Sequence, residues 1–147
     1  MVIRVRGSVG VKGEIEETLR RLRLTRVNHA NVVDDSPVTK GMLQKAKDYI
    51  TWGEVEPEVL EAAIAKRGEF LDGKPFSEEE LKNRTGKDLK TYVRDLIEGK
   101  EKFSKLFKPL RLHPPRKGYR SIKKPFKVGG ALGYRGKAIN DLLRRMI

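Results

Sequence analysis

The positive charge of this chain is concentrated in its last third. Residues 100–147 carry fifteen lysines and arginines but only two acidic side chains, whereas residues 1–55 carry ten basic and seven acidic ones and residues 56–99 carry eight and eleven. A segment with so many like charges repels itself and cannot be buried in an apolar core. A solvated basic face is one explanation, but a surface that meets a polyanion explains the imbalance better. We therefore divide the chain into a core, an acidic segment and a basic extension at these boundaries.

The composition of the whole chain agrees with a polyanionic partner. The chain has 147 residues, of which 37% are hydrophobic and 36% charged, and its formal net charge is +13. An anionic membrane and the absence of any partner are the alternatives, but such a charge favours a nucleic acid. The lack of cysteine excludes disulfides, thiolate zinc ligands and a thiol nucleophile. No secretion signal and no apolar run of membrane-spanning length is visible, so we expect a cytoplasmic protein.

The first 55 residues alternate between patterns typical of strands and of helices. The strand-like runs are rich in β-branched residues, and the first helical run has apolar side chains at positions i, i+4 and i+7. Ser36 and Pro37 fit the cap and the first position of a second helix. The predicted order is therefore βαβαβ. Strands are expected over residues 2–7, 27–33 and 49–55, a helix over 14–22, and a glycine-punctuated loop over 8–13.

The acidic segment, residues 56–99, is predicted to be a small helical lobe. Pro57 begins one helix, and Gly68 is a probable end for it. Ser77 precedes three glutamates, as in a capping box, and so marks the start of a second helix. A third helix is expected over residues 88–98. The lobe either covers the sheet or stands beside it.

The basic extension is predicted to be a loop that is tethered at both ends. Two prolines keep residues 110–115 extended. A flexible turn is expected over residues 129–133, where three of the five residues are glycine. Residues 137–146 have apolar side chains at helical spacing, so a terminal helix is expected to dock on the rest of the protein.

The chemistry of this loop is that of an RNA-binding segment. Lysine and arginine neutralise phosphates and release counterions, and glycines let the backbone approach a sugar-phosphate chain closely. Tyr119, Phe126 and Tyr134 stand among the cations. Each of these rings has two equally good roles, either stacking on an unpaired base or packing in a core.

No catalytic, metal or nucleotide site is indicated by the sequence. Gly136-Lys137 looks like part of a phosphate-binding loop, but the next residue is Ala138 instead of serine or threonine. The two histidines, His29 and His113, are too few for a metal centre, and no nucleophile stands at a useful spacing from a base. We interpret His29 as an interior residue and His113 as an RNA contact, and we expect no cofactor.

Several short motifs occur in an order that is found in one protein family. In the core they are the opening strand Val2 to Arg6, Thr18-Leu19, Val27-Asn28, Lys40-Gly41-Met42 and Trp52-Gly53-Glu54. In the extension they are Leu112-His113-Pro114-Pro115-Arg116, Gly129-Gly130 with Gly133 and Arg135, Ile139-Asn140, and Arg144-Arg145-Met146. With these motifs the chain resembles the ribosomal protein family called L-thirty in bacteria and archaea and L-seven in eukaryotes.

The match of the extension is confined to the archaeal and eukaryotic branch of the family. The long basic N-terminal extension of the eukaryotic members does not precede Met1 here, so we expect an archaeal protein. The chain departs from the family at Lys40, where arginine is frequent, at Ala131, where a polar residue is frequent, and at Tyr134, where asparagine is frequent.

The resemblance implies an α+β fold. Its βαβαβ core would have a three-stranded antiparallel sheet with two helices packed on it, similar to a ferredoxin-like unit, and a helical insertion lobe, a basic C-terminal loop and a terminal helix would be added. It also implies a structural constituent of the large ribosomal subunit, bound to large-subunit ribosomal RNA and neighbouring ribosomal proteins. No enzymatic activity, membrane partner or small-molecule substrate is expected.

The basic residues of the loop and of the first strand are the expected RNA contacts. The alternative is an RNA-processing enzyme or accessory factor that holds its substrate with the basic loop, although the acid–base groups of the extension are scattered. The candidate RNA-binding residues are Arg4, Arg6, Lys40, Arg111, His113, Arg116, Lys117, Arg120, Lys123, Lys124, Lys127, Arg135 and Lys137.

Overall fold

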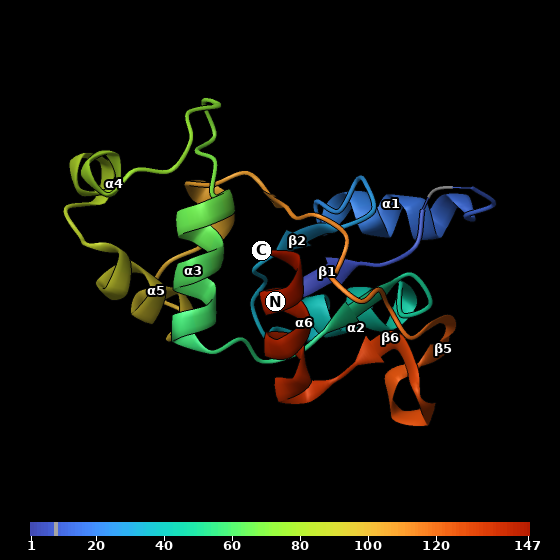
Figure 1. The fold of residues 1–147 in the computed structure, drawn as a ribbon. Coiled ribbons are helices and arrows are strands. Elements are labelled where there is room, and N and C mark those ends of the chain that lie inside the picture. The colour runs from blue at the N-terminus through green and yellow to red at the C-terminus, as the bar shows by residue number, and fades with distance from the viewer. Residues whose placement is uncertain (8) are drawn as a thin grey trace.

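The computed structural model describes residues 1–7 and 9–147, so Ser8, within the loop predicted over residues 8–13, lies outside the described residues. Six α-helices and six strands are formed in this part of the chain (Figure 1). The βαβαβ order predicted for the core is confirmed. The core contains β1 (Val2–Arg4), α1 (Gly13–Arg21), β2 (His29–Asn31), α2 (Pro37–Lys45) and β3 (Ile50–Trp52). The lobe contains α3 (Pro57–Arg67), α4 (Glu78–Thr85) and α5 (Leu89–Ile97). The extension contains η1 (Phe103–Lys105), β4 (Leu110–Arg111), β5 (Ser121–Pro125), η2 (Phe126–Val128), β6 (Gly130–Tyr134), η3 (Gly136–Ala138) and α6 (Ile139–Met146).

The strands form one mixed sheet in the order β4-β2-β1-β3-β6-β5. β1 pairs antiparallel with both β2 and β3, and β4 pairs antiparallel with β2. β6 lies parallel to β3, and β5 lies parallel to β6. The α+β class is confirmed, but the expectation of a three-stranded antiparallel sheet is wrong. Only the central strands have that arrangement, because the extension adds three further strands at the two edges.

Strand β6 occupies the segment in which the sequence predicts a flexible turn. A Cβ atom on Gly130 would lie 1.9 Å from the carbonyl oxygen of Lys124 in β5. The Thr51 hydroxyl donates a hydrogen bond of 2.8 Å to the carbonyl oxygen of Gly133. Glycine in this strand therefore permits close approach of two backbones. Such close approach is a common reason for glycine inside a strand.

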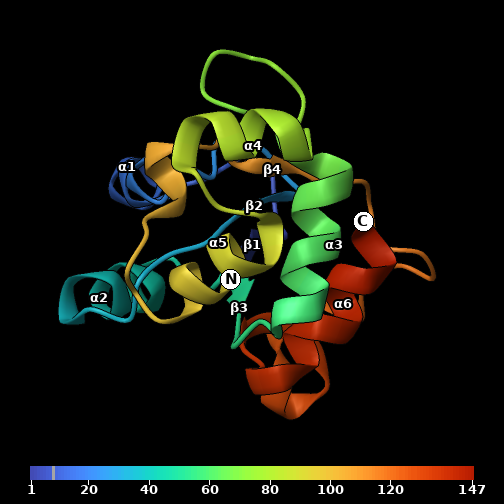
Figure 2. The ribbon, with the colours of Figure 1, turned by 90° about the vertical axis from the view of Figure 1, so that its left-hand side faces the viewer.

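Helices cover both faces of the sheet (Figures 1 and 2). Val2 and Ile3 are neighbours in β1 and belong to different buried clusters, as expected for successive residues of a strand. Helices α1 and α2 pack on the face of Val2, and α3 and α6 pack on the face of Ile3. The first cluster includes Leu19, Leu22, Leu43 and Ile50, and the second includes Leu60, Ile64, Leu142 and Leu143.

The helical starts predicted from capping residues are confirmed. The Ser36 hydroxyl accepts a hydrogen bond of 3.2 Å from the Thr39 backbone N–H at the start of α2. The Ser77 hydroxyl accepts one of 3.2 Å from the Glu80 backbone N–H at the start of α4. Each bond satisfies a backbone donor that the helix itself leaves unpaired.

Stacked phenylalanines join the lobe to the extension. The rings of Phe70, from the lobe, and Phe107, from the extension, are 4.9 Å apart between centroids. The rings of Phe103 and Phe107 also stack, with their centroids 5.1 Å apart, and all three rings are buried. The acidic lobe is therefore held by apolar contact with the extension, in addition to the ion pairs of Lys108 with Glu69 and Arg144 with Glu56.

Arg4 of β1 lies in the interior and fixes the chain around it. Its side chain has no exposed surface. Its Nη1 donates to the carbonyl oxygen of Leu24 at 2.7 Å, and its Nε donates to that of Arg6 at 2.9 Å. Its Nη2 lies 3.7 Å from a carboxylate oxygen of Glu16 in α1. The guanidinium thereby joins β1 to α1 and to the turn that follows this helix.

Replacing Arg4 by methionine should destabilise the fold. The Leu24 carbonyl would lose its buried donor, and we expect a loss of about 2 to 4 kcal/mol in the free energy of unfolding, measured with urea. Arg21→Met on the exposed face of α1 is the control, and its unfolding midpoint should stay that of the wild type. Equal midpoints for the two variants would contradict an internal role for Arg4.

Candidate nucleic-acid interface

A long run of the chain contains no acidic residue. From Lys102 to Asn140 the sequence has twelve lysines and arginines and neither aspartate nor glutamate. This run forms β4, β5 and β6 and the turns between them. Neighbours in the sequence therefore cannot neutralise its positive charge.

Most cations of the extension also lack a carboxylate partner in space. Of the fifteen basic residues in 100–147, twelve make no ion pair within the described residues. The three that do are Lys100 with Glu98, Lys108 with Glu69, and Arg144 with Glu56 and Asp141. Unpaired cations at this density are typical of a surface that meets phosphates.

The lobe pairs its cations in a different way. Lys87 donates to Asp95 at 2.6 Å and to Glu101 at 2.8 Å, and these hydrogen bonds raise the pKa of Lys87 above its ordinary value. Arg84 likewise donates to Asp72 at 2.6 Å and to Glu80 at 2.8 Å. These ion pairs, one of which uses Glu101 of the extension, neutralise Arg84 and Lys87 of the lobe, whereas most cations of the extension have no such partner.

The outermost strand presents several of the expected contacts. Every residue of β5 is exposed, including Lys123 and Lys124, and Lys127 follows in the exposed part of η2. Lysines on an edge strand also prevent that strand from pairing with another chain. Both roles require the side chains to stand in solvent, where phosphates can reach them.

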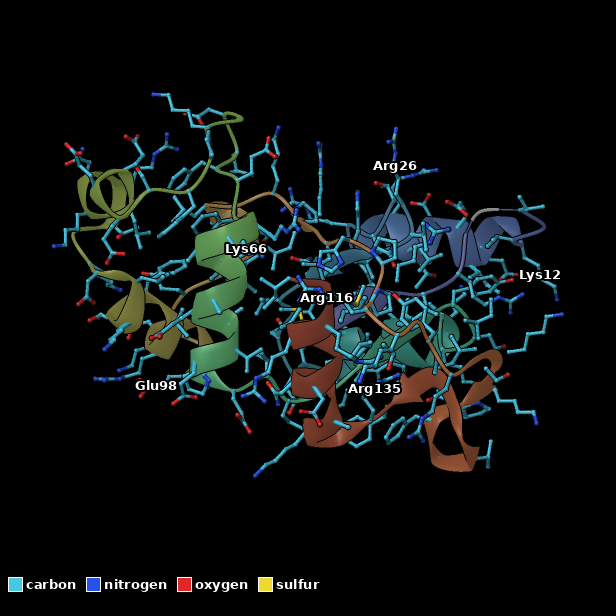
Figure 3. The ribbon with its side chains drawn as sticks, in the orientation of Figure 1. Lys12, Arg26, Lys66, Glu98, Arg116 and Arg135 are labelled. Carbon is cyan, nitrogen blue, oxygen red and sulfur yellow. The ribbon has the colours of Figure 1, made fainter. Side chains whose placement is uncertain are left out.

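A tight turn holds Arg116 and Lys117 against the end of α6. The Arg116 backbone N–H donates to the Arg145 carbonyl oxygen at 3.0 Å. In return, Nη1 of Arg145 donates to the carbonyl oxygens of Arg116 at 3.1 Å and Gly118 at 2.9 Å. Figure 3 shows Arg116 beside α6, on the other side of that helix from the lobe residue Glu98. The two cations are thus exposed on a turn that is fixed from within.

Arg135 follows β6 and is held on three sides. Its Nε donates to the Thr51 hydroxyl at 2.8 Å, and its Nη2 donates to the Ala131 carbonyl oxygen at 2.7 Å. Its guanidinium stacks 4.8 Å from the centre of the Phe126 ring. Burial lowers the pKa of Arg135 to about 10, with a further contribution from Arg145, so the group stays protonated at neutral pH.

Four candidate contacts besides Arg135 are engaged within the protein. Arg4 has no exposed surface, so we leave it out of the proposed RNA contacts. Arg6 stacks 5.1 Å from the centre of the Tyr49 ring, and Lys40 pairs with Asp35 at 3.5 Å. The ring nitrogens of His113 lie 2.6 Å from the Pro114 carbonyl oxygen and 2.9 Å from that of Ile147. The candidates that the structure leaves exposed are Arg111, Arg116, Lys117, Arg120, Lys123, Lys124, Lys127 and Lys137.

The three aromatic residues of the extension have different surroundings. The Tyr119 hydroxyl donates to the Asn28 side-chain oxygen at 2.8 Å, and burial raises the pKa of this phenol to about 12. Phe126 supports Arg135, as described above. Tyr134 is 54% exposed and hydrogen-bonds to Glu54. Of the three, only Tyr134 leaves more than half of its surface open for stacking.

Further cations were not singled out by the sequence. Lys102 and Lys105 are exposed around η1 and make no ion pair within the described residues. Arg145 lies on α6, and in the sequence this segment is marked by apolar side chains at helical spacing, which indicate a packed helix and not a binding surface. The start of the acid-free run at Lys102 is the sequence signal that identifies the first two.

Two other kinds of site were sought in the described part of the chain. Residues 1–7 and 9–147 hold no group of three or more histidine, cysteine, aspartate or glutamate side chains that is placed to bind a metal ion. None of the helices described here has both the length and the apolar character needed to cross a bilayer.

The chain is similar to known proteins over nearly its whole length. A model of the family described as ribosomal protein L30p/L7e matches residues 1–50. The large ribosomal subunit protein uL30 of Methanopyrus kandleri is 50% identical over 149 residues, which cover 97% of this chain and 100% of that protein. The proteins of the same name from Methanobrevibacter smithii and Thermoplasma volcanium are 49% and 47% identical over 150 residues. These matches cover 100% and 99% of this chain and 99% and 91% of the two relatives.

Gly130→Ala should move β5 away from β6. The new Cβ would meet the Lys124 backbone, with the carbonyl carbon at 2.3 Å, and a backbone cannot move aside as a flexible side chain does. We expect amide resonances of β5 and β6 to shift and the thermal midpoint to fall by several degrees, about what 1 kcal/mol causes in a domain of this size. Gly13→Ala is the control, since nothing lies within 4 Å of its added Cβ. A Gly130→Ala protein with unchanged resonances would contradict the pairing of these strands.

Proposed function

The chain belongs to the L30p/L7e family of ribosomal proteins and is a structural, non-enzymatic protein of the large ribosomal subunit, and we propose that its basic extension binds large-subunit ribosomal RNA. The observation that carries the proposal is the set of twelve cations in residues 100–147 that make no ion pair within the described residues. Ribosomal RNA supplies one phosphate per nucleotide, and each phosphate neutralised by lysine or arginine releases counterions.

The proposed contacts come from the exposed cations of the extension. They are Arg111, Arg116, Lys117, Arg120, Lys123, Lys124, Lys127 and Lys137, together with the half-buried Arg135. Because they are carried by the sheet edge, by a turn fixed to α6 and by η3, the protein scaffold limits their freedom before RNA binds. A scaffold of this kind reduces the entropy lost on binding. Arg6, Lys40 and His113 stay secondary candidates, since each already has a partner inside the protein.

The alternative of an RNA-processing enzyme has no support in the site. His113 faces the backbone oxygens of Pro114 and Ile147, and within the described residues its ring contacts no side-chain nucleophile or carboxylate. Asp141 is an exposed partner of Arg144, and Glu101 is a partner of Lys87. These three groups are therefore occupied separately and do not form an acid–base pair.

Replacing Lys123, Lys124 and Lys127 by glutamine should weaken binding to large-subunit ribosomal RNA. If all three side chains touch phosphates, the slope of log affinity against log salt should fall by about two to three units, at roughly 0.7 to 0.9 for each contact. Filter binding over a salt series measures this slope. The fold should be unchanged, because all three side chains stand in solvent.

The matched control replaces three exposed lysines of the lobe, Lys74, Lys82 and Lys90. It removes the same formal charge from the same protein. Near physiological salt the Debye length is about 8 Å, so a distant charge contributes little and the control should keep the wild-type slope. An equal fall in the slope for the two variants would indicate a general effect of net charge and would contradict the extension as the binding element.

A further inference from the structure

A small groove opens where β5, β6 and α6 meet. Its volume is about 220 Å³. Three arginines from different parts of the extension reach it: Arg120 from the segment before β5, Arg135 from the end of β6, and Arg145 from α6. The aromatic rings of Tyr119 and Phe126 form part of its wall.

Each arginine has N–H groups that no partner occupies within the described residues. Arg135 uses Nε and Nη2 for Thr51 and Ala131, and its Nη1 makes no hydrogen bond there. Arg145 uses only Nη1, to hold the turn at Arg116. Arg120 makes neither a hydrogen bond nor an ion pair in this part of the chain. The groove therefore offers several N–H donors, and two of the three guanidinium groups that carry them, those of Arg135 and Arg145, are already fixed in place.

The positive charge of the groove has little compensation. The only acidic residue in its lining is Asp141, whose side chain is 83% exposed and pairs with Arg144 at 3.5 Å. Burial and repulsion from Arg145 and Arg120 both lower the pKa of Arg135. Three like charges beside an aromatic wall are costly in the free protein, and a bound anion would offset that cost.

We propose that this groove is a binding site for a single phosphate group of the RNA backbone. The inference rests on the proposed function, and it assigns one specific contact within the RNA-binding surface. Phosphate fits because its oxygens accept hydrogen bonds from several directions, and guanidinium forks match that geometry. Most of the groove's lining belongs to the acid-free run that also carries Lys123, Lys124 and Lys127, so a polyanion that follows these lysines passes it. A carboxylate from a neighbouring protein is the competing ligand, and the experiment below separates the two.

The first arm of the experiment uses the full chain and inorganic phosphate. Phosphate is titrated against chloride at constant ionic strength while the Nε–H resonance of Arg135 is followed by NMR. We expect a saturable shift, and Arg120→Gln should weaken phosphate binding by about threefold or more, since it removes a charge-assisted contact. Lys90→Gln, on the exposed surface of the lobe, is the control and should leave the phosphate affinity unchanged. No saturable shift, or an equal shift with acetate, would overturn the proposal.

The second arm measures binding of large-subunit ribosomal RNA by Arg120→Gln and by Lys127→Gln, whose side chain does not line the groove. Arg120→Gln should lower the affinity by about tenfold, and Lys127→Gln by about threefold or less, because only the first removes a donor of a preformed site. If the two changes lower the RNA affinity equally while the wild-type chain binds the RNA, the groove is not the phosphate site, and the proposed function still stands. A wild-type chain that does not bind the RNA would instead overturn the proposed function. Arg120 has no intramolecular hydrogen bond within the described residues, so its variant should fold, and a thermal melt verifies this.

Discussion

Backbone pairing between β3 and β6 joins the basic extension to the core. Thr51 and Trp52 lie opposite Gly133 and Tyr134, and the Thr51 hydroxyl holds the Gly133 carbonyl. The same hydroxyl accepts a hydrogen bond from Arg135, so one core residue fixes both the strand and a cation that follows it. Close contact continues beyond the strand, because a Cβ on Gly53 would lie 1.9 Å from the Gly136 carbonyl oxygen. The position of β5, of the groove and of the start of α6 all follow from this junction.

The acidic residues of the lobe and the basic residues of the extension are separated in space. Arg84 pairs with carboxylates of the lobe, Lys87 pairs with one of the lobe and one of the extension, and stacked phenylalanines attach the lobe to the extension. Ion pairs with the lobe engage only three cations of the extension, Lys100, Lys108 and Arg144, so the other twelve are not neutralised in this way within the described residues. In Figure 1 the lobe helices α4 and α5 lie at the opposite side of the molecule from β5. One chain thus keeps an acidic and a basic surface apart, and leaves the basic one available to RNA.

Local signals in the sequence were reliable, and signals that depend on distant pairing were not. Ser36 and Ser77 predict helix starts because the hydroxyl of the cap and the backbone N–H that donates to it are three residues apart. β6 was not predicted, because its glycines are typical of a turn. Gly130 is needed because the backbone of the neighbouring strand lies close to it, and the sequence pattern does not reveal that neighbour. The burial of Arg4 was not predicted for a related reason. Alternation places Arg4 and Arg6 on one face, but only the packed structure shows that helix α1 and the turn after it enclose the first of them. The charge of the extension was predictable, whereas the convergence of Arg120, Arg135 and Arg145 on one groove requires the three-dimensional fold.

The β3–β6 junction also sets an order of events during folding. Thr51 and Gly133 are 82 positions apart, and β2 pairs with β4 at a similar separation, whereas β1 pairs with β2 and β3, which are nearer in the sequence. Contacts at short separation form first, because closing a long loop costs more entropy. Until the lobe and most of the extension have been synthesised, the nascent chain therefore carries open edges on β2 and β3, of the kind that can pair with other chains. The strands that cover these edges belong to the extension, so the step that closes the sheet also places the cations that we propose as RNA contacts.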